Sequence, residues 1–519
     1  MFLKKHSNLL ILFFLFVISF VVRINSLNNS FVLDDFRLII DNSFIQNIGN
    51  FLKIADPRNF FDVLPVVCGA RPLTVISLMV DFFLFGQNPF GYHLINLILH
   101  GFNVVLLFLF VFNLTENRKA GLLSALLFSI HPIQSEVINI ASFRADLLFV
   151  FFMLVFLNLI NILKNKKENK KKLIIVFMFF AFLCALFSKE NAIVIPVILS
   201  AYILFFYKET GIKYFLITTV FVTAVFMFFF WIERFPVPLY NLVYPSIENN
   251  IIPLSSFGTY LNIIFASVYY NLMHIVYPVN LSVDYFVSYS NFQSAFVVLF
   301  ISIYIFLMFK IKDVYLKFIM LFTLAVYLPV SNIVPLVNTV ADRYMYLPMI
   351  GISMIFGYVI IKFLEVVNPK IIYAFVVFLF SIFALISYQR GKVYSNQYTL
   401  YQDALLKNPQ NVRTAYNMGV AYIANKEFAN AISQFADVAK INPIYRRDQV
   451  WLLTAISYEA LGQKESAKKY YHKALLLNHK DGNIVQKFKE AFGDINQAKQ
   501  YFVENTARVD KETLFHFEK

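Results

Sequence analysis

The sequence has few charged residues and almost no cysteine. Asp, Glu, Lys and Arg make up 15% of the 519 residues, against 59% hydrophobic and 18% aromatic residues. Soluble globular chains carry about 25% charged residues, so this composition excludes an ordinary soluble protein. The two cysteines, Cys68 and Cys184, lack the spacing of a metal site and say nothing firm about the redox compartment.

A convincing cleavage site of small residues is also missing after the first apolar run. Lys4 and Lys5 precede this run, which extends from Leu9 to Val22 and is followed directly by Arg23. The arrangement resembles a signal peptide without its processing site. We expect an uncleaved first helix with its N-terminus in the cytoplasm.

Hydrophobic residues are gathered in blocks up to Ser387, each about 15–22 residues long, which is the length that crosses a bilayer as a helix. After the first run they lie near 92–112, 120–137, 145–163, 173–187, 190–207, 214–231, 293–309, 314–330, 343–363 and 370–388. Lys and Arg collect in alternate loops, at 118–119, 164–172, 208–213, 310–317 and 362–370. By the positive-inside rule these loops are cytoplasmic. The net charge of +14 therefore reflects topology and not nucleic-acid binding.

This alternation predicts an all-α polytopic domain over 1–390 with about eleven membrane-spanning helices. A further block at 258–277 breaks the alternation if it spans, so we interpret it as re-entrant or interfacial. The first external loop covers 28–91. Within it Arg71 and Asp81 fall in a short apolar piece, which favours an interfacial helix over a span.

Past Tyr394 the long apolar blocks stop and helical hairpins repeat every 34–36 residues or so, the period of tetratricopeptide repeats. The first copy places its small, aromatic and proline residues at Gly419, Tyr422, Ala431, Phe435 and Pro443; the second uses Trp451, Ala455, Tyr458, Ala467, Tyr471 and Ala474. A half repeat with Tyr401, Ala404 and Pro409 precedes them. We therefore predict repeats over 391–480, followed at 481–519 by a capping helix and a tail. The topology places the repeats outside the cytoplasm.

Charged residues recur at the external ends of the predicted helices. They are Asp34, Asp35, His131, Glu136, Arg144, Asp146, Lys189, Glu190, Asp284 and Arg343. Ionised groups near a membrane cost several kcal/mol unless they are paired, so a one-sided set usually marks a site. The structural alternative is mutual pairing that only fixes helix ends. For His131, which precedes a proline, a simple capping role is the main alternative.

The set suits sugar transfer from a lipid phosphate. A carboxylate can take the proton of an acceptor hydroxyl that attacks an anomeric carbon. The phosphate that leaves needs cations or a metal, and Arg144, Lys189 and Arg343 could supply that charge without one. We predict no metal ligands and no required cofactor. Adjacent side chains rarely point the same way, so one of Asp34 and Asp35 should act while the other positions it.

Several motifs, taken in order, resemble the transmembrane and tetratricopeptide-repeat O-mannosyltransferase family. They begin with Val32-Leu-Asp-Asp35, Arg71-Pro-Leu-Thr and Asn88-Pro-Phe-Gly-Tyr-His-Leu-Ile-Asn96-Leu-Ile-Leu-His100. His131-Pro-Ile-Gln-Ser-Glu136, Arg144-Ala-Asp, Ser188-Lys-Glu190, Leu281-Ser-Val-Asp-Tyr285, Leu328-Pro-Val-Ser-Asn332 and Asp342-Arg-Tyr-Met-Tyr-Leu-Pro348 complete them. The motifs add Arg71 and His93 to the site candidates. Phe143 and Gln134 depart from the family, which often has glycine and histidine there.

The resemblance implies a fold similar to GT-C glycosyltransferases, with the catalytic base at Asp34 or Asp35 and the donor phosphate at Arg144, Lys189 and Arg343. It implies transfer of mannose or a similar hexose from a polyprenyl-phosphate donor to an extracytoplasmic protein or glycan, in the inner membrane of a prokaryote. The partners would be membrane lipid and a protein bound by the repeats. Two alternatives stay open: a non-catalytic scaffold that binds proteins through its repeats, and a polysaccharide ligase or polymerase.

Overall fold

The computed structural model describes residues 2–55, 71–164, 168–206, 257–334, 336, 338–492 and 500. All its regular elements in these ranges are helical, which confirms the predicted all-α class. The predicted block at 214–231 and most of the tail lie outside the described residues. The chain divides into two compact units. The first takes in the described residues before Asp284 and those from Val287 to Asn396; the second takes in Asp284–Phe286 and the chain from Gln397 onward.

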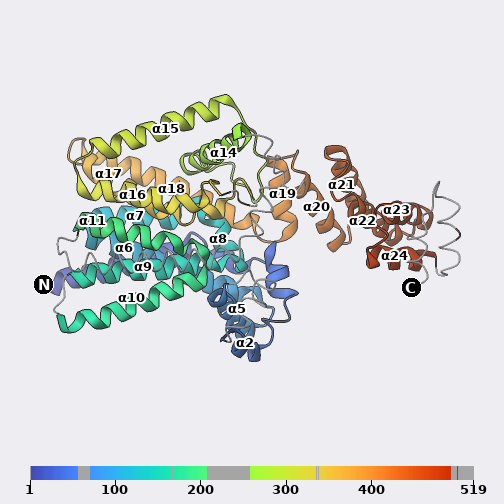
Figure 1. Cartoon of the computed structure of the whole chain (residues 1–519), viewed down its shortest axis with the longest axis horizontal. Helices are drawn as coiled ribbons and strands as arrows, with labels where there is room; N and C mark the ends of the chain where they lie inside the picture. Colours follow the sequence, from blue (N-terminus) through green and yellow to red (C-terminus); the bar gives the residue numbers. More distant parts are fainter. Residues whose placement is uncertain are drawn as a thin grey trace. The chain divides into compact units, whose positions relative to one another are not determined.

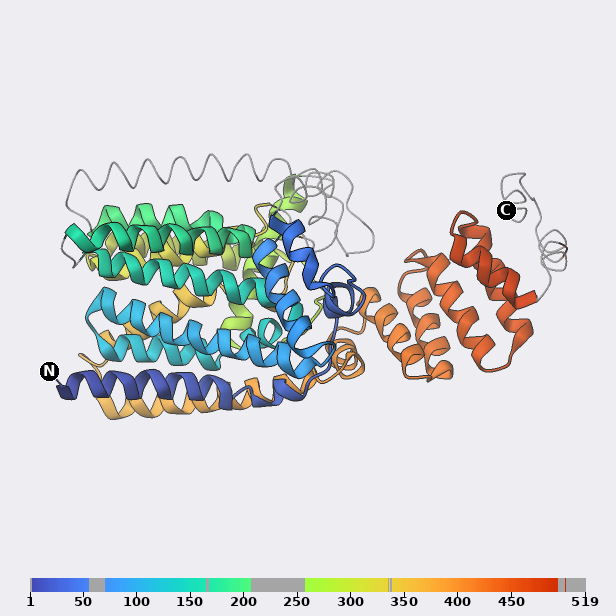
Figure 2. The ribbon, with the colours of Figure 1, turned by 90° about the horizontal axis from the view of Figure 1, so that it is seen from below.

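The first unit is a bundle of long helices (Figures 1 and 2). Its longer members are α1 (Phe2–Val21), α5 (Pro72–Phe85), α6 (Pro89–Thr115), α7 (Arg118–Ile130), α9 (Arg144–Lys164), α10 (Glu168–Ser188), α11 (Val194–Phe206), α14 (Phe257–Val276), α15 (Asn291–Lys310), α16 (Val314–Tyr327), α17 (Pro348–Phe363) and α18 (Pro369–Val393). Helix α6 packs against α1, α7 and α9, while α16 packs against α11 and α17. One large apolar core joins these helices.

Five helical segments in the described part are long and apolar enough to cross a bilayer: Pro89–Thr115, Ala141–Leu163, Lys171–Ser188, Asn291–Lys310 and Pro369–Val393. A sixth is possible if Arg118–Ile130 and Pro132–Asn139 form one span, bent by 54°. Shorter apolar helices occupy other predicted blocks. The protein is thus a multi-pass membrane protein. The count of eleven spans and the interfacial placement of α14 stay predictions.

The bend after α7 arises at His131-Pro132. A proline disfavours helical backbone in the residue before it, and His131 is extended, with φ −66° and ψ 129°. The chain then makes a 3-10 turn at Pro132–Gln134 and the short helix α8 (Ser135–Asn139). Figure 1 shows α8 and α5 at the same end of the bundle. This end carries the charged residues described below.

Small residues let helices approach closely inside the bundle, as is common in membrane proteins. A Cβ added at Gly357 of α17 would lie 2.2 Å from Oγ of Ser124 and 2.6 Å from the carbonyl oxygen of Ala120, both on α7. A Cβ added at Gly351 of the same helix would lie 2.4 Å from Oγ1 of Thr323 on α16. The glycines therefore set the separation of α17 from both neighbours.

The second unit is a stack of helical hairpins (Figure 2). It contains α19 (Gln397–Lys407), α20 (Val412–Ala424), α21 (Phe428–Ile441), α22 (Arg447–Ala460), α23 (Lys464–Leu477) and α24 (Gly482–Phe492). Phe435 fills the space beside Gly419, where a Cβ would lie 2.6 Å from its ring. Ile484 and Phe488 of α24 are fully buried against the last hairpin, so α24 caps the stack.

Candidate functional site

The two adjacent acids lie in the segment that follows α1, and the backbone turns them apart. Leu33 has φ +53°, a left-handed conformation that leucine rarely adopts. Asp34 is exposed, whereas Asp35 is completely buried. Backbone N–H groups of Val32, Ala141 and Ser142 donate hydrogen bonds to the Asp35 carboxylate, at 3.1, 3.3 and 2.7 Å. The pair is thus divided into an exposed acid and a buried anchor.

Burial raises the pKa of Asp35 to about 6, although the hydrogen bonds from Ser142, Val32 and Ala141 act in the opposite direction. The carboxylate joins two segments that are 106 residues apart in the chain. Since all three donors are backbone groups, Asp35 fixes the path of the loop that presents Asp34. That one acid acts while its neighbour positions it stays a prediction.

Arg343 stands on the turn that precedes α17, where it contacts a buried carboxylate. Its backbone N–H and its Nη1 both donate to Glu136 of α8, at 2.7 and 2.6 Å. The guanidinium lies over the rings of Phe143 and Tyr344, with centroid distances of 4.9 and 5.1 Å. Glu136 is fully buried, while the Arg343 side chain keeps 19% of its surface exposed. The arginine is therefore held rigidly with one edge open to solvent.

Asp34 lies within electrostatic range of Arg343. Burial by itself would lower the pKa of Arg343, but Glu136, together with Tyr344 and Asp34, raises it above its ordinary value. The exposed Asp34 carboxylate therefore favours the charged form of the partly exposed Arg343 guanidinium. The sequence predicted both residues for the site.

Arg71, at the start of α5, is the most exposed cation among the site candidates. Its Nε and Nη2 donate to the two carboxylate oxygens of Glu190, at 3.0 and 2.6 Å, and the side chains are 34% and 39% exposed. Burial lowers the pKa of Arg71, yet Glu190 and Asp146 raise it overall, while Arg343 opposes them. Arg71 and Arg343 thus act on one another electrostatically.

Two of the three predicted phosphate contacts are buried. Nζ of Lys189 lies 2.6 Å from Oδ1 of Asp146, and these side chains are only 11% and 7% exposed. Arg144 is completely buried and forms an ion pair with Asp81 of α5. It also donates to Oδ1 of Asn96 at 2.8 Å and to the carbonyl of Tyr92 at 2.9 Å. Asp81 and Asn96 are partners of Arg144 that the sequence did not identify.

Arg144→Leu is expected to destabilise the protein, because it leaves the Asp81 carboxylate buried without its cation. Breaking a buried ion pair by removing one partner costs about 3–5 kcal/mol. The measurement is the thermal midpoint of the monodisperse fraction in detergent. The double variant Arg144→Leu/Asp81→Leu should recover part of the loss. An unchanged midpoint in Arg144→Leu would contradict a structural role.

The remaining candidates take other positions. His131 accepts a hydrogen bond at Nδ1 from the backbone N–H of Ile133, at 3.2 Å, and its Nε2 lies 3.0 Å from the carbonyl of Ile275, which is capping geometry. His93 is fully buried in α6. Asp284 belongs to the second unit and forms an ion pair with Arg413. In the described ranges no three His, Cys, Asp or Glu side chains are grouped to hold a metal ion.

Together, fold and site define a helical multi-pass membrane protein with charged side chains at one end of its bundle and a tetratricopeptide-repeat unit. The comparisons with known proteins agree with this class. A family model for the tetratricopeptide repeat matches residues 448–481, which confirms the second predicted repeat; the bounds 391–480 stay a prediction.

Curated relatives carry the name protein O-mannosyl-transferase. The chain is 24% identical to F38B6.6 of Caenorhabditis elegans, over 85% of this chain and 63% of that protein. It is 32% identical to Tmtc1 of Drosophila melanogaster over 34% of this chain and 20% of that protein. With human TMTC3 it shares 34% identity over 26% of this chain and 15% of the relative. The matched part of the chain spans less than two thirds of each of these relatives. The names of the relatives confirm the resemblance that the motifs indicated.

Proposed function

We propose that the protein is a membrane glycosyltransferase that moves a hexose from a polyprenyl-phosphate donor to a hydroxyl group of an acceptor. Mannose is the sugar that the names of the relatives suggest. The observation that carries the proposal is the exposed Asp34 beside the buried, triply hydrogen-bonded Asp35, with Arg343 in electrostatic range. A base and a cation at one surface are what this reaction needs.

In this mechanism Asp34 accepts the proton of the acceptor hydroxyl as its oxygen attacks the anomeric carbon. The bond between that carbon and the phosphate oxygen breaks, and the lipid phosphate keeps the electron pair. Arg343 and Arg71 stabilise the negative charge on the phosphate, because they are the site cations with exposed guanidinium surface. Asp35 is a positioning residue for the loop of Asp34.

The buried cations support the site indirectly. Lys189 neutralises Asp146 at the start of α9, and Arg144 neutralises Asp81. Since neither has more than slight exposure, we assign the donor phosphate to Arg71 and Arg343 in place of Arg144 and Lys189. Glu190 and Glu136 hold the two exposed arginines in place before the donor binds.

We further infer the orientation from the distribution of Lys and Arg. It places the N-terminus in the cytoplasm and both the charged end of the bundle and the repeats outside it. The relatives whose names support the assignment are eukaryotic. We therefore propose no prokaryotic inner-membrane location for this protein. The repeats would then engage an extracytoplasmic acceptor or a partner protein.

The test uses the full chain in nanodiscs with radiolabelled polyprenyl-phosphate mannose, and with the glucose and galactose analogues as competitors. With water as the acceptor in this assay, we expect time-dependent release of polyprenyl phosphate and free hexose from one of these donors, and inhibition by unlabelled donor. The matched control is Arg447→Gln, a change in the repeats that leaves the membrane site intact. If no lipid-phosphate hexose is bound or consumed, the glycosyltransferase proposal is wrong.

A further inference from the structure

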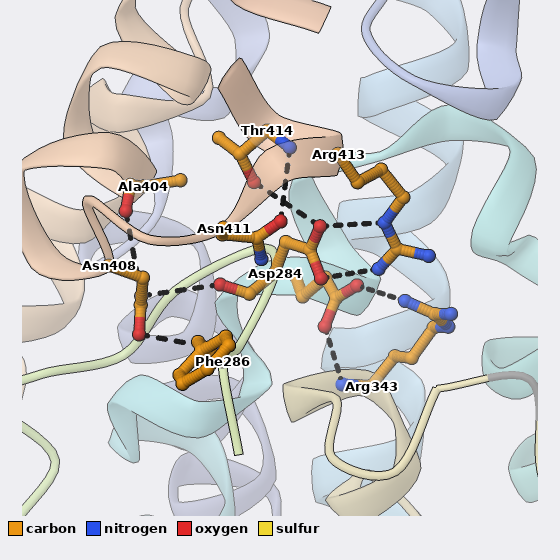
Figure 3. A network of polar contacts seen from close by, with 9 residues as sticks. Asp284, Phe286, Arg343, Ala404, Asn408, Asn411, Arg413 and Thr414 are labelled. Carbon is orange, nitrogen blue, oxygen red and sulfur yellow. Dashed lines mark hydrogen bonds and ion pairs between the residues drawn. The ribbon is translucent and has the colours of Figure 1, made fainter. Parts of the chain in front are cut away.

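The second unit contains a short segment that comes from elsewhere in the chain. Asp284–Phe286, from the connection between α14 and α15, lies against the turn between α19 and α20 (Figure 3). The side chain of Arg413 contacts both carboxylate oxygens of Asp284, with Nε at 2.7 Å from Oδ2. The hydroxyl of Thr414 donates to the same oxygen at 3.2 Å. A carboxylate therefore has three side-chain hydrogen bonds here.

The backbone of this segment is recognised as well. Nδ2 of Asn408 donates to the carbonyl oxygen of Asp284 at 3.3 Å, and the N–H of Phe286 lies 3.5 Å from Oδ1 of Asn408. One side-chain amide therefore contacts both a backbone acceptor and a backbone donor of this segment. Contacts to backbone groups are independent of side-chain identity, so they can hold a peptide segment of varied sequence.

The turn is built to present these groups. The N–H of Asn408 donates to the carbonyl of Ala404 at 2.9 Å, and Asn411 caps α20 by accepting from Thr414 at 3.1 Å. Arg413 and Thr414 consequently stand in the first turn of a 13-residue helix, where the helix dipole also favours a carboxylate. The Arg413 guanidinium, the Thr414 hydroxyl and the Asn408 amide therefore all contact Asp284 at the start of α20.

The next repeat provides an internal comparison. Asn442 and Arg447 stand 34 residues after Asn408 and Arg413, which is one repeat period. There the side chain of Asn442 accepts from the N–H of Ile444 at 3.2 Å, and Arg447 lies over the ring of Trp451 at 4.4 Å. The same residue types are engaged within their own repeat, so among the described residues only the first turn contacts a segment from between α14 and α15 through this asparagine and arginine.

We propose that the α19–α20 turn is a binding site for a non-helical peptide segment that carries an aspartate, and that Asp284–Phe286 is its tethered occupant. A partner or acceptor segment of this chemistry would compete with the tethered occupant. A tethered segment acts at an effective concentration on the order of millimolar, so weak ligands are excluded until the segment is released. The proposal does not depend on sugar transfer.

The test uses the full chain in detergent and a fluorescent peptide that copies residues 281–288. Asp284→Asn weakens the tethered occupant, so it should bind the peptide about 10-fold more tightly than the unchanged protein, as expected for loss of a charged hydrogen bond. Adding Arg413→Gln should abolish this gain, whereas adding the repeat-matched Arg447→Gln should preserve it. A peptide with Asn in place of Asp should bind at least about 10-fold more weakly.

Equal affinity for Asp284→Asn and the unchanged protein, or no binding to either, would overturn the proposal. So would a gain that survives Arg413→Gln. A second measurement requires no change at Asp284: Asn408→Ala should speed hydrogen exchange of the Phe286 amide, and its repeat-matched control Asn442→Ala should not. Equal exchange in both variants would show that Asn408 does not hold the segment.

Discussion

Asp34→Asn is expected to lower sugar transfer from the polyprenyl-phosphate donor by about 10²- to 10⁴-fold, the usual contribution of a general base. The change keeps the shape of the side chain and removes its ability to take a proton. Asp34 is exposed and is not needed to anchor its loop, since Asp35 makes the buried contacts. The rate of polyprenyl-phosphate release at saturating donor measures the effect, and donor affinity should change little.

Asp35→Asn is the matched control. It removes the charge that accepts three backbone N–H groups, so it should loosen the loop and lower the thermal midpoint as well as the rate. Asp34→Asn should lower the rate alone. Near-normal transfer by Asp34→Asn with loss only in Asp35→Asn would move the base to the second acid. Near-normal transfer by the double variant would refute the acid pair as the catalytic centre.

Arg343→Ala is expected to reduce kcat/KM for the donor by about 30-fold or more, because truncating one partner of a hydrogen-bonded charge pair costs about 2–5 kcal/mol. Part of this loss comes from the missing phosphate contact. The rest comes from Glu136, which is fully buried and would lose its cation. The measurement is donor-concentration dependence of polyprenyl-phosphate release.

Arg343→Lys separates the two contributions. Lysine retains a cation for Glu136, but it lacks the planar fork that can contact carboxylate and phosphate together. We expect a near-normal thermal midpoint with donor use still reduced. If Arg343→Lys restored full donor use, the arginine would serve only to neutralise Glu136.

The sequence could not predict which of the site cations are buried and which are partly exposed. Arg144, Lys189 and Arg343 all follow or precede apolar blocks in the same way, so local pattern gave them equal standing. Their burial depends on Asp81, Asp146 and Glu136. Side chains brought together by packing of separate helices leave no local signature.

The amino-acid sequence by itself determined the class of this protein. Hydrophobic block length, the alternation of Lys-rich loops and the spacing of small and aromatic residues are local properties, and they predicted the helical membrane bundle and the repeats that end it. The order of the motifs likewise predicted that the catalytic base is one of the two acids after the first helix.

Only the tertiary structure decided what each charged group contacts. Asp34 and Asp35 differ by one position, yet Asp35 is buried because the N–H groups of Ala141 and Ser142, more than 100 residues away, converge on it. Asp284, expected among the membrane-site residues, instead pairs with Arg413, 129 residues further along the chain. The free energy of a charged group depends on which distant groups replace its water, and that depends on the packed fold.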